Sequence, residues 1–185
     1  MRNVAVLFAR SNSIYKTMPG VDVWDEERDA RNWPGGAPVV AHPPCQQWCR
    51  LSHMARVNAE QKALAPWAVD QVRRFGGVLE HPYKSKLWSA MGLPNGTQRD
   101  KWGGYTITLP QFWFGHQANK ATHFYIVGCK PEDLPAVPLV LGRASLCVAT
   151  SVGKRGEKEM KKSERIMTPP VMAEWLVETA RRCNV

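Results

Sequence analysis

Runs of apolar residues recur along the chain and predict a set of short strands. The first is a continuous apolar stretch from residue 4 to residue 9, which is typical of a strand buried on both faces of a sheet. The third begins directly after the turn Pro34-Gly35-Gly36, where the backbone can change direction. The expected strands cover residues 4–9, 21–24, 38–41, 78–80, 105–109 and 123–127.

Helical periodicity separates several of these strands. Residues 60–75 place apolar side chains at helical spacing, and a glycine pair ends the pattern. Residues 85–91 form a shorter candidate, and 171–183 follow Thr168, a natural N-cap, and two prolines that suit a first helical turn. Strands that alternate with helices predict one α/β domain over residues 1–185, with a mostly parallel sheet flanked by helices.

The chain has a net charge of +9, from 25 lysines and arginines against 16 aspartates and glutamates. A basic surface attracts phosphate polymers, so we expect a nucleic acid as partner, with a merely basic protein as the alternative. Residues 151–165 are polar and poorly periodic, and we expect them to form a mobile loop. The basic residues of this stretch are Lys154, Arg155, Lys158, Lys161, Lys162 and Arg165.

No stretch is long and apolar enough to cross a bilayer, and the start of the chain lacks the pattern of a signal peptide. Five cysteines, an odd number at irregular spacing, then favour reduced thiols and a cytoplasmic location. Each thiol is a candidate for core packing, metal binding or nucleophilic chemistry. We assign Cys129, Cys147 and Cys183 to the core or to no specific role, which leaves Cys45 and Cys49.

Cys45 follows the strand expected at residues 38–41 and two prolines that stiffen the loop. Open α/β sheets place their sites at the carboxyl ends of parallel strands, so this thiol is a candidate nucleophile. A nucleophilic thiol needs a lowered pKa, which we expect His42 or Arg50 to supply. A buried structural cysteine after a turn is the alternative.

Glu80 ends the strand expected at residues 78–80 and precedes His81-Pro82. Two neighbouring strand ends that carry Cys45 and Glu80 could converge on one substrate. Glu80 would then act as an acid, which requires a pKa raised by burial or by a like charge. A surface glutamate at a strand end is the alternative.

Residues 111–128 interleave aromatic side chains with amides, histidines and Lys120. Such a segment could stack a base and hold phosphate, whereas a hairpin that packs its rings into the core is the alternative. A different chemistry is open to His42, Cys45, Cys49 and His53, because four possible zinc ligands stand in a short span. The paired Cys-x-x-Cys spacing is missing, and two prolines restrict the turn.

Four segments resemble, in order, catalytic and C-terminal motifs of the DNA cytosine-5 methyltransferases. Pro43-Pro44-Cys45-Gln46 is similar to the family's Pro-Cys motif, and Leu79-Glu80-His81-Pro82 to its Glu-Asn-Val motif. Residues 123–128 resemble the strand that closes its Gln-x-Arg-x-Arg motif. Residues 168–173 resemble the proline-containing start of its last helix.

Two earlier segments resemble the cofactor half of the same family. Leu7-Phe8-Ala9 is similar to the opening of its first motif, and Asp29-Ala30-Arg31 to its short acidic motif. The resemblance implies a Rossmann-like, methyltransferase-type domain that binds S-adenosylmethionine at Phe8, Asp29 and Pro43. Arg10-Ser11-Asn12-Ser13 replaces the family's glycine-rich turn, and one strand–helix unit is missing before residue 38, so we expect a truncated sheet. Compact forms of this kind are typical of bacteriophage genomes.

The resemblance also implies a mechanism. Cys45 would attack C6 of a cytosine flipped out of DNA, while Glu80 would hold N3 and lend it a proton. C5 would then attack the methyl group of S-adenosylmethionine or another one-carbon electrophile, and Cys45 would leave by elimination. A non-catalytic nucleic-acid-binding protein of the same fold is the alternative. The residues expected to contact DNA are Gln46, Arg50, Lys120, His123, Lys161, Lys162 and Arg165.

Overall fold

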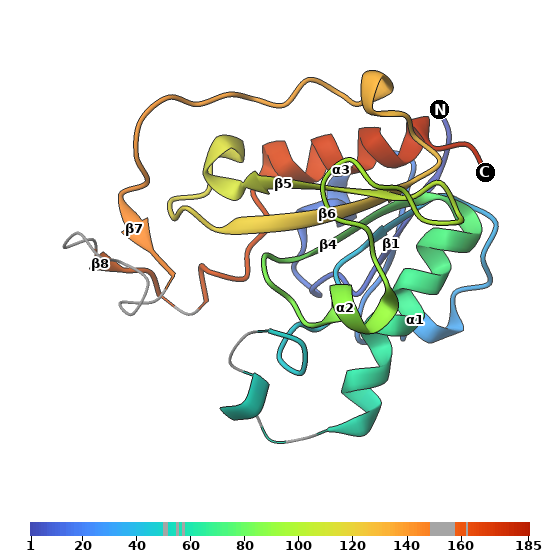
Figure 1. Cartoon of the computed structure of the whole chain (residues 1–185), viewed down its shortest axis with the longest axis horizontal. Coiled ribbons are helices and arrows are strands. Elements are labelled where there is room, and N and C mark those ends of the chain that lie inside the picture. The colour runs from blue at the N-terminus through green and yellow to red at the C-terminus, as the bar shows by residue number, and fades with distance from the viewer. Residues whose placement is uncertain (50–51, 55, 57, 149–157, 162) are drawn as a thin grey trace.

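The computed structural model describes the chain except for residues 50, 51, 55, 57, 149–157 and 162. Within the described residues, six strands form the main sheet, in the order β2-β1-β3-β4-β6-β5 (Figure 1). The first four in this order run parallel, and β6 runs antiparallel to both β4 and β5. The mostly parallel α/β sheet expected from the apolar runs is therefore confirmed. The strands are β1 (Val4–Leu7), β2 (Val21–Trp24), β3 (Val39–Ala41), β4 (Gly77–Pro82), β5 (Tyr105–Pro110) and β6 (Ala121–Val127).

One long helix covers each face of the sheet (Figure 1). Helix α1 (Ala59–Phe75) packs in the same cluster as Leu79, whereas α3 (Pro170–Arg182) packs in the cluster that contains Val78. Because neighbouring residues of a strand point to opposite faces, these clusters are the two sides of the sheet. The short helix α2 (Leu87–Met91) lies on the α1 side. No helix in the described part of the chain is long and apolar enough to span a membrane.

Helix α1 shows how the sequence fixes an element. The side chain of Asn58 caps its start by accepting a hydrogen bond from the backbone N–H of Gln61, at 3.0 Å. Its buried side consists of small and β-branched residues at helical spacing, which allows close approach to the sheet. Gly76, with a φ of 73°, ends the helix in a conformation that side chains disfavour. Pro66 lies well inside the helix rather than in its first turn.

The connections around β2 are short, as the missing strand–helix unit predicts. The 3-10 helix η1 (Ile14–Thr17) joins β1 to β2, and η2 (Ala30–Asn32) lies between β2 and β3. Residues 8–38 are all described and contain no α-helix.

The segment before α3 contains a small second sheet. β8 (Lys158–Glu159) pairs in parallel with β7 (Leu146–Cys147) and lies within residues 151–165, whose expected mobility stays a prediction. Met160 is buried directly after β8. Three further 3-10 helices complete the described elements: η3 (Ser52–Met54), η4 (Gln111–Phe114) and η5 (Pro131–Asp133).

Gly77→Ala should destabilise the fold strongly. A Cβ atom at Gly77 would lie 2.0 Å from the carbonyl oxygen of Val39, and its φ of +129° is itself unfavourable for a side chain. Gly36→Ala is the control, because its φ is +91° but no atom lies within 4 Å of the added Cβ. Urea unfolding should show a loss of about 3 kcal/mol or more for the first variant and about 1 kcal/mol for the second. Equal losses would contradict the close contact between β3 and β4.

Candidate active site

The carboxyl ends of β1, β3 and β4 meet at one edge of the sheet, because these strands are parallel neighbours. The chain leaves β1 for β2 on one side and returns to β3 on the other, which makes a topological switch point between β1 and β3. Phe8 and His42 directly follow β1 and β3, and Glu80 stands at the same level of β4. Ligands of open α/β sheets bind at such an edge.

His42 connects Glu80 to Tyr15, a buried residue of η1. Nδ1 of His42 lies 3.1 Å from Oε2 of Glu80, and Nε2 lies 2.9 Å from the hydroxyl oxygen of Tyr15. A carboxylate can only accept hydrogen bonds, so Nδ1 of His42 carries the hydrogen. Burial, and then the charge of Glu80, raise the pKa of Tyr15 well above its ordinary value, so its hydroxyl keeps its proton and donates to Nε2.

Gln111 holds the other oxygen of Glu80. Its Nε2 lies 3.0 Å from Oε1 of Glu80 and 3.0 Å from the hydroxyl of Thr122, the β6 residue paired with Pro82. The amide must present its nitrogen here, because a carboxylate offers no hydrogen to accept. The amide oxygen of Gln111 is buried and makes no hydrogen bond within the described part of the chain.

The carboxyl group of Glu80 is strongly acidic. Burial alone would raise its pKa, but the positive charge of Lys120 and the hydrogen bond from His42 lower it to about 2. The raised pKa expected of an acid is therefore wrong for the protein as it stands. Near neutral pH Glu80 is a carboxylate that accepts hydrogen bonds, and only 13% of its side chain is exposed.

The thiol of Cys45 also differs from expectation. Burial is the main cause that raises its pKa, and the charge of Glu80 adds to it, while the charge of Lys120 opposes both. The lowered pKa expected for this thiol is therefore wrong, and the ring of His42 is bound to Glu80 and Tyr15; Arg50, the other expected source, lies outside the described residues. The charges of Glu80 and Lys120 nevertheless act on the thiol, and the charge of Lys120 acts on Glu80.

Three further expected residues surround this site. Lys120 precedes β6, and its Nζ donates to the carbonyl oxygen of Arg165 at 3.4 Å. Gln46 is exposed in the turn that follows Cys45, where it is free to meet a ligand. Pro43, expected to bind the cofactor, is buried between the end of β3 and this turn.

His123 lies elsewhere. It follows Thr122 along β6, and successive residues of a strand point to opposite faces, so it stands on the α1 side while Thr122 stands beside Gln111. Its ring stacks on Trp88 at a centroid distance of 4.7 Å, and its Nδ1 lies 2.8 Å from the hydroxyl of Thr108. A contact of His123 with a base held by Glu80 is therefore not supported.

The basic residues after β8 have different surroundings. Lys161 is exposed. The guanidinium group of Arg165 binds the carbonyl oxygen of Met160 at 2.9 Å and pairs with the carboxylate of Glu159, so it stabilises its own segment. Lys162 lies outside the described residues, as does the first part of the basic stretch.

The ends of β1 and β2 do not form a site that fits S-adenosylmethionine. Asp25 directly follows β2 and is 3% exposed, with Oδ2 held 2.6 Å from Nζ of Lys16. Lys16 belongs to η1, which directly follows Arg10-Ser11-Asn12-Ser13, the residues that stand where the resembling family has its glycine-rich turn. Phe8 has a φ of 63° and packs against Trp67 with ring centroids 5.8 Å apart.

Asp29 is likewise engaged with its own segment. Its carboxylate accepts hydrogen bonds from the backbone N–H and the guanidinium group of Arg31, between 2.6 and 3.0 Å. The hydrogen bonds from Arg31 lower the pKa of Asp29. The carboxylate therefore caps η2 and offers little to a cofactor.

The zinc alternative also finds no support. Among the described residues, no group of three or more histidines, cysteines or acidic residues could hold a metal ion. Both ring nitrogens of His42 already have partners, and Cys49 donates from Sγ to the carbonyl oxygen of Gln46 at 3.5 Å.

Glu80→Gln should make the protein less sensitive to acid. The pKa of Glu80 falls from 4.5 to about 2 on folding, so its carboxylate stabilises the fold above pH 4.5, and this stabilisation is lost as the pH falls toward 2. A shift of that size corresponds to about 3 kcal/mol. Urea unfolding at pH 7 and pH 3 should show a smaller loss of free energy of unfolding for the variant than for the wild type. Glu174→Gln, an exposed carboxylate of α3, is the control and should lose as much as the wild type; an equal loss in all three proteins would contradict the role of Glu80.

Comparison with known proteins adds no family to this description. No protein-family model matches the chain, and a search of the curated proteins returns no match. What the chain can do is therefore inferred from Cys45, Glu80 and the residues that hold them.

Proposed function

We propose that the chain is an enzyme that acts on a cytosine of DNA through a covalent adduct with Cys45, as its resemblance to the cytosine-5 methyltransferases suggests. The observation that supports this proposal is the shared environment of Cys45, Glu80 and Lys120 at the ends of β3 and β4. A nucleophile, a carboxylate and a cation are the groups that addition to a pyrimidine requires.

In the proposed step, the thiolate of Cys45 forms a bond to C6 of the base, and the electron pair of the C5–C6 double bond moves toward C5. The Glu80 carboxylate accepts a hydrogen bond from the exocyclic amino group, and the nearby ring nitrogen gains a proton as the adduct forms. The solvent supplies that proton, because the pKa of Tyr15 is raised and its hydroxyl keeps its own, while His42 keeps the carboxylate of Glu80 in place. Lys120 stabilises the thiolate and the developing negative charge.

The partner proposed for this site is DNA with the target base out of the stack. The net charge of +9 supports a polyanion, and Gln46 and Lys161 are exposed where they could contact it. The family's donor, S-adenosylmethionine, would supply a methyl group to C5. No transfer step from it is proposed, because two of the residues expected to bind that donor are engaged within the protein, Asp29 by Arg31 and Phe8 by Trp67.

A non-catalytic nucleic-acid-binding protein is the second candidate. The raised pKa of Cys45 favours it, because a thiol that keeps its proton is a poor nucleophile. The ion pair between Lys16 and Asp25 at the end of β2 favours the binding protein as well. The two candidates differ in one property, which is whether Cys45 ever bonds to a base.

Wild-type protein should form a covalent adduct with a DNA oligonucleotide that contains 5-azacytosine. Ring nitrogen N5 of this base takes a proton after the thiolate has added to C6, so the adduct needs no methyl donor. Cys45→Ser should give no adduct while remaining folded, and Cys49→Ser should give the wild-type yield, since its thiol points to the carbonyl oxygen of Gln46. Denaturing gels followed by peptide mass spectrometry would identify the modified residue.

The rate of this adduct should rise with pH. Because burial raises the pKa of Cys45 above 9.0, the thiolate fraction should increase about tenfold for each unit between pH 7 and pH 9. The measurement is the initial rate of adduct formation at constant ionic strength. DNA binding without any adduct over this range would contradict the enzymatic proposal and favour the binding protein.

A further inference from the structure

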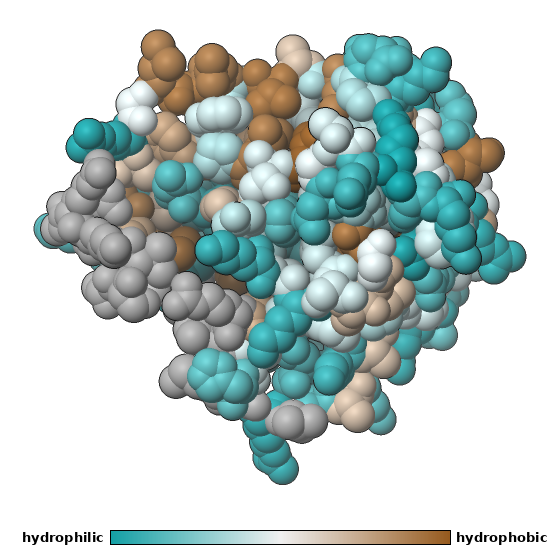
Figure 2. Space-filling view, in the orientation of Figure 1, coloured by the Kyte–Doolittle hydropathy of each residue, from teal (hydrophilic) through white to brown (hydrophobic). Residues whose placement is uncertain are grey.

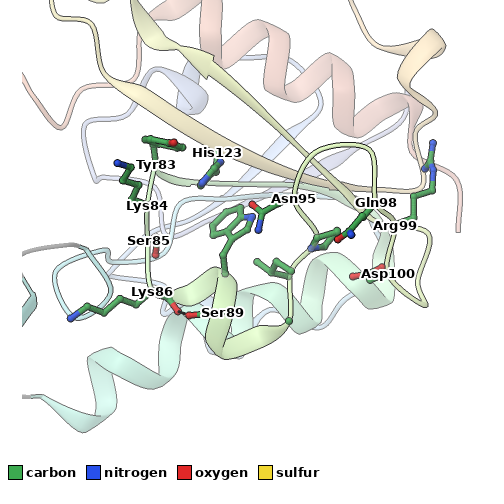
Figure 3. A pocket seen from close by; sticks show the side chains of 14 residues that line it. Tyr83, Lys84, Ser85, Lys86, Ser89, Asn95, Gln98, Arg99, Asp100 and His123 are labelled. Carbon is green, nitrogen blue, oxygen red and sulfur yellow. Dashed lines mark hydrogen bonds between the residues drawn. The ribbon is translucent and has the colours of Figure 1, made fainter.

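A second concave site lies on the opposite face of β4. An open cavity of about 880 Å³ is bounded by the start of α2, the segment that follows α2, and β6 (Figure 3). Its lining comes from residues 83–89 and 92–100 and from His123. Neither Cys45 nor Glu80 contributes to this lining, so the cavity is distinct from the site described above.

One wall of the cavity is a fixed stack of rings. His123 stacks on Trp88 with an interplanar angle of 28°, and the ring of Tyr83 meets it edge-on at 5.0 Å. Hydrogen bonds fix the two inner rings, from Trp88 Nε1 to Thr106 at 3.0 Å and between His123 and Thr108. Tyr83 is 47% exposed, and Figure 3 shows it beside His123 at one end of the cavity. The exposed ring of Tyr83, next to these fixed rings, is a platform on which a flat base can stack.

The rim of the cavity is positively charged. Lys84, Lys86 and Arg99 line it, and none of them pairs with a carboxylate among the described residues. Asp100 is the one carboxylate of the lining, and it is already used, since it accepts from the hydroxyl of Tyr125 at 2.6 Å and from two backbone N–H groups. Lys84 places its Nζ 5.4 Å from the centroid of the Tyr83 ring, and a cation beside an aromatic platform suits a phosphate and its base.

Two amide side chains add hydrogen-bonding capacity to this surface. Asn95 and Gln98 line the cavity and are exposed, and Figure 3 shows both on the segment that follows α2. Amides offer donors and acceptors together, which suits the edge of a base. The cavity therefore presents stacking, charge and hydrogen bonds within one concave surface.

We propose that this cavity binds a nucleotide of single-stranded nucleic acid that lies about three positions along the strand from the base held at Cys45 and Glu80. The inference rests on the proposed function, because it takes the substrate to be a nucleic acid. Glu80 and Tyr83 are three residues apart, about 10 Å along an extended chain, which corresponds to about three stacked nucleotides at 3.4 Å each. A single strand is favoured over a duplex because its bases are free to leave their neighbours and stack on the protein.

The Cys45 loop and the cavity are also joined directly. The carbonyl oxygen of Trp48, three residues after Cys45, accepts from the backbone N–H of Lys86 at 2.8 Å and from the hydroxyl of Ser85 at 3.3 Å. Nζ of Lys86 donates to the hydroxyl of Ser52 at 2.9 Å. A single strand of nucleic acid that passes from one site to the other would follow these contacts around the end of β4.

The test is the affinity of Cys45→Ser protein, which cannot form the adduct, for a fluorescent single-stranded oligonucleotide. Tyr83→Ala should weaken binding about tenfold, whereas Tyr83→Phe, which keeps the ring, should bind within about twofold of the parent. Lys84→Gln should lower the slope of log affinity against log salt by about 0.7. Lys130→Gln is the matched control, because this exposed lysine follows the far end of β6.

Parent-like affinity and salt dependence in both the Tyr83→Ala and Lys84→Gln proteins would overturn the nucleotide site. The nucleotide site would also be overturned by tighter binding of a duplex of equal length, with Tyr83→Ala changing the affinity for neither the duplex nor the single strand. A tenfold effect of Tyr83→Ala alongside an absent Cys45 adduct would support the site while rejecting the proposed chemistry. An adduct that forms normally, with no effect of Tyr83→Ala on binding, would support the proposed chemistry and reject the nucleotide site.

Discussion

The buried carboxylate of Glu80 is the constraint on which this edge of the sheet depends. Removing such a charge from water costs several kcal/mol unless partners surround it, and here each oxygen has one. The partners come from both halves of the fold, with His42 from the parallel strands and Gln111 from the antiparallel pair. β3, β4 and β6 must therefore assemble in register before the charge is satisfied, and the same assembly carries the Cys45 loop to the carboxylate.

The elements of the fold were predictable from the sequence, whereas the bonds at the site were not. Strands such as residues 38–41 stand out because a strand buried on both faces is apolar throughout. The links from Glu80 to His42 and Gln111 span 38 and 31 residues, and no local pattern encodes such contacts. The predicted directions of the pKa shifts of Cys45 and Glu80 were wrong for the same reason, since burial and partners distant in sequence decide these pKa values. Tyr15 carries no motif at all, and its role becomes visible once η1 lies against the end of β3.

The truncated half of the sheet limits the chemistry that the rest can perform. A short 3-10 helix between β1 and β2 is too small to cover a cofactor, and it brings Lys16 to Asp25 instead. That ion pair joins the end of β2 to the preceding connection and leaves Asp25 almost without exposed surface. This half of the sheet is therefore held together by internal contacts, whereas Glu80 and its partners stand at the ends of β3 and β4.

Alternation along two neighbouring strands divides the remaining polar residues between two sites. On β4, Glu80 belongs to the α3 side and the next residue, His81, to the α1 side, where burial lowers its pKa to about 4 and keeps it neutral. On β6, Thr122 supports Gln111 while His123 joins the ring stack of the cavity. Because β4 and β6 pair residue by residue, a register shift of one position would exchange both sets at once. The carboxylate and the ring platform are therefore fixed relative to each other by one ladder of backbone hydrogen bonds, and a ligand long enough to reach both would meet a rigid spacing between them.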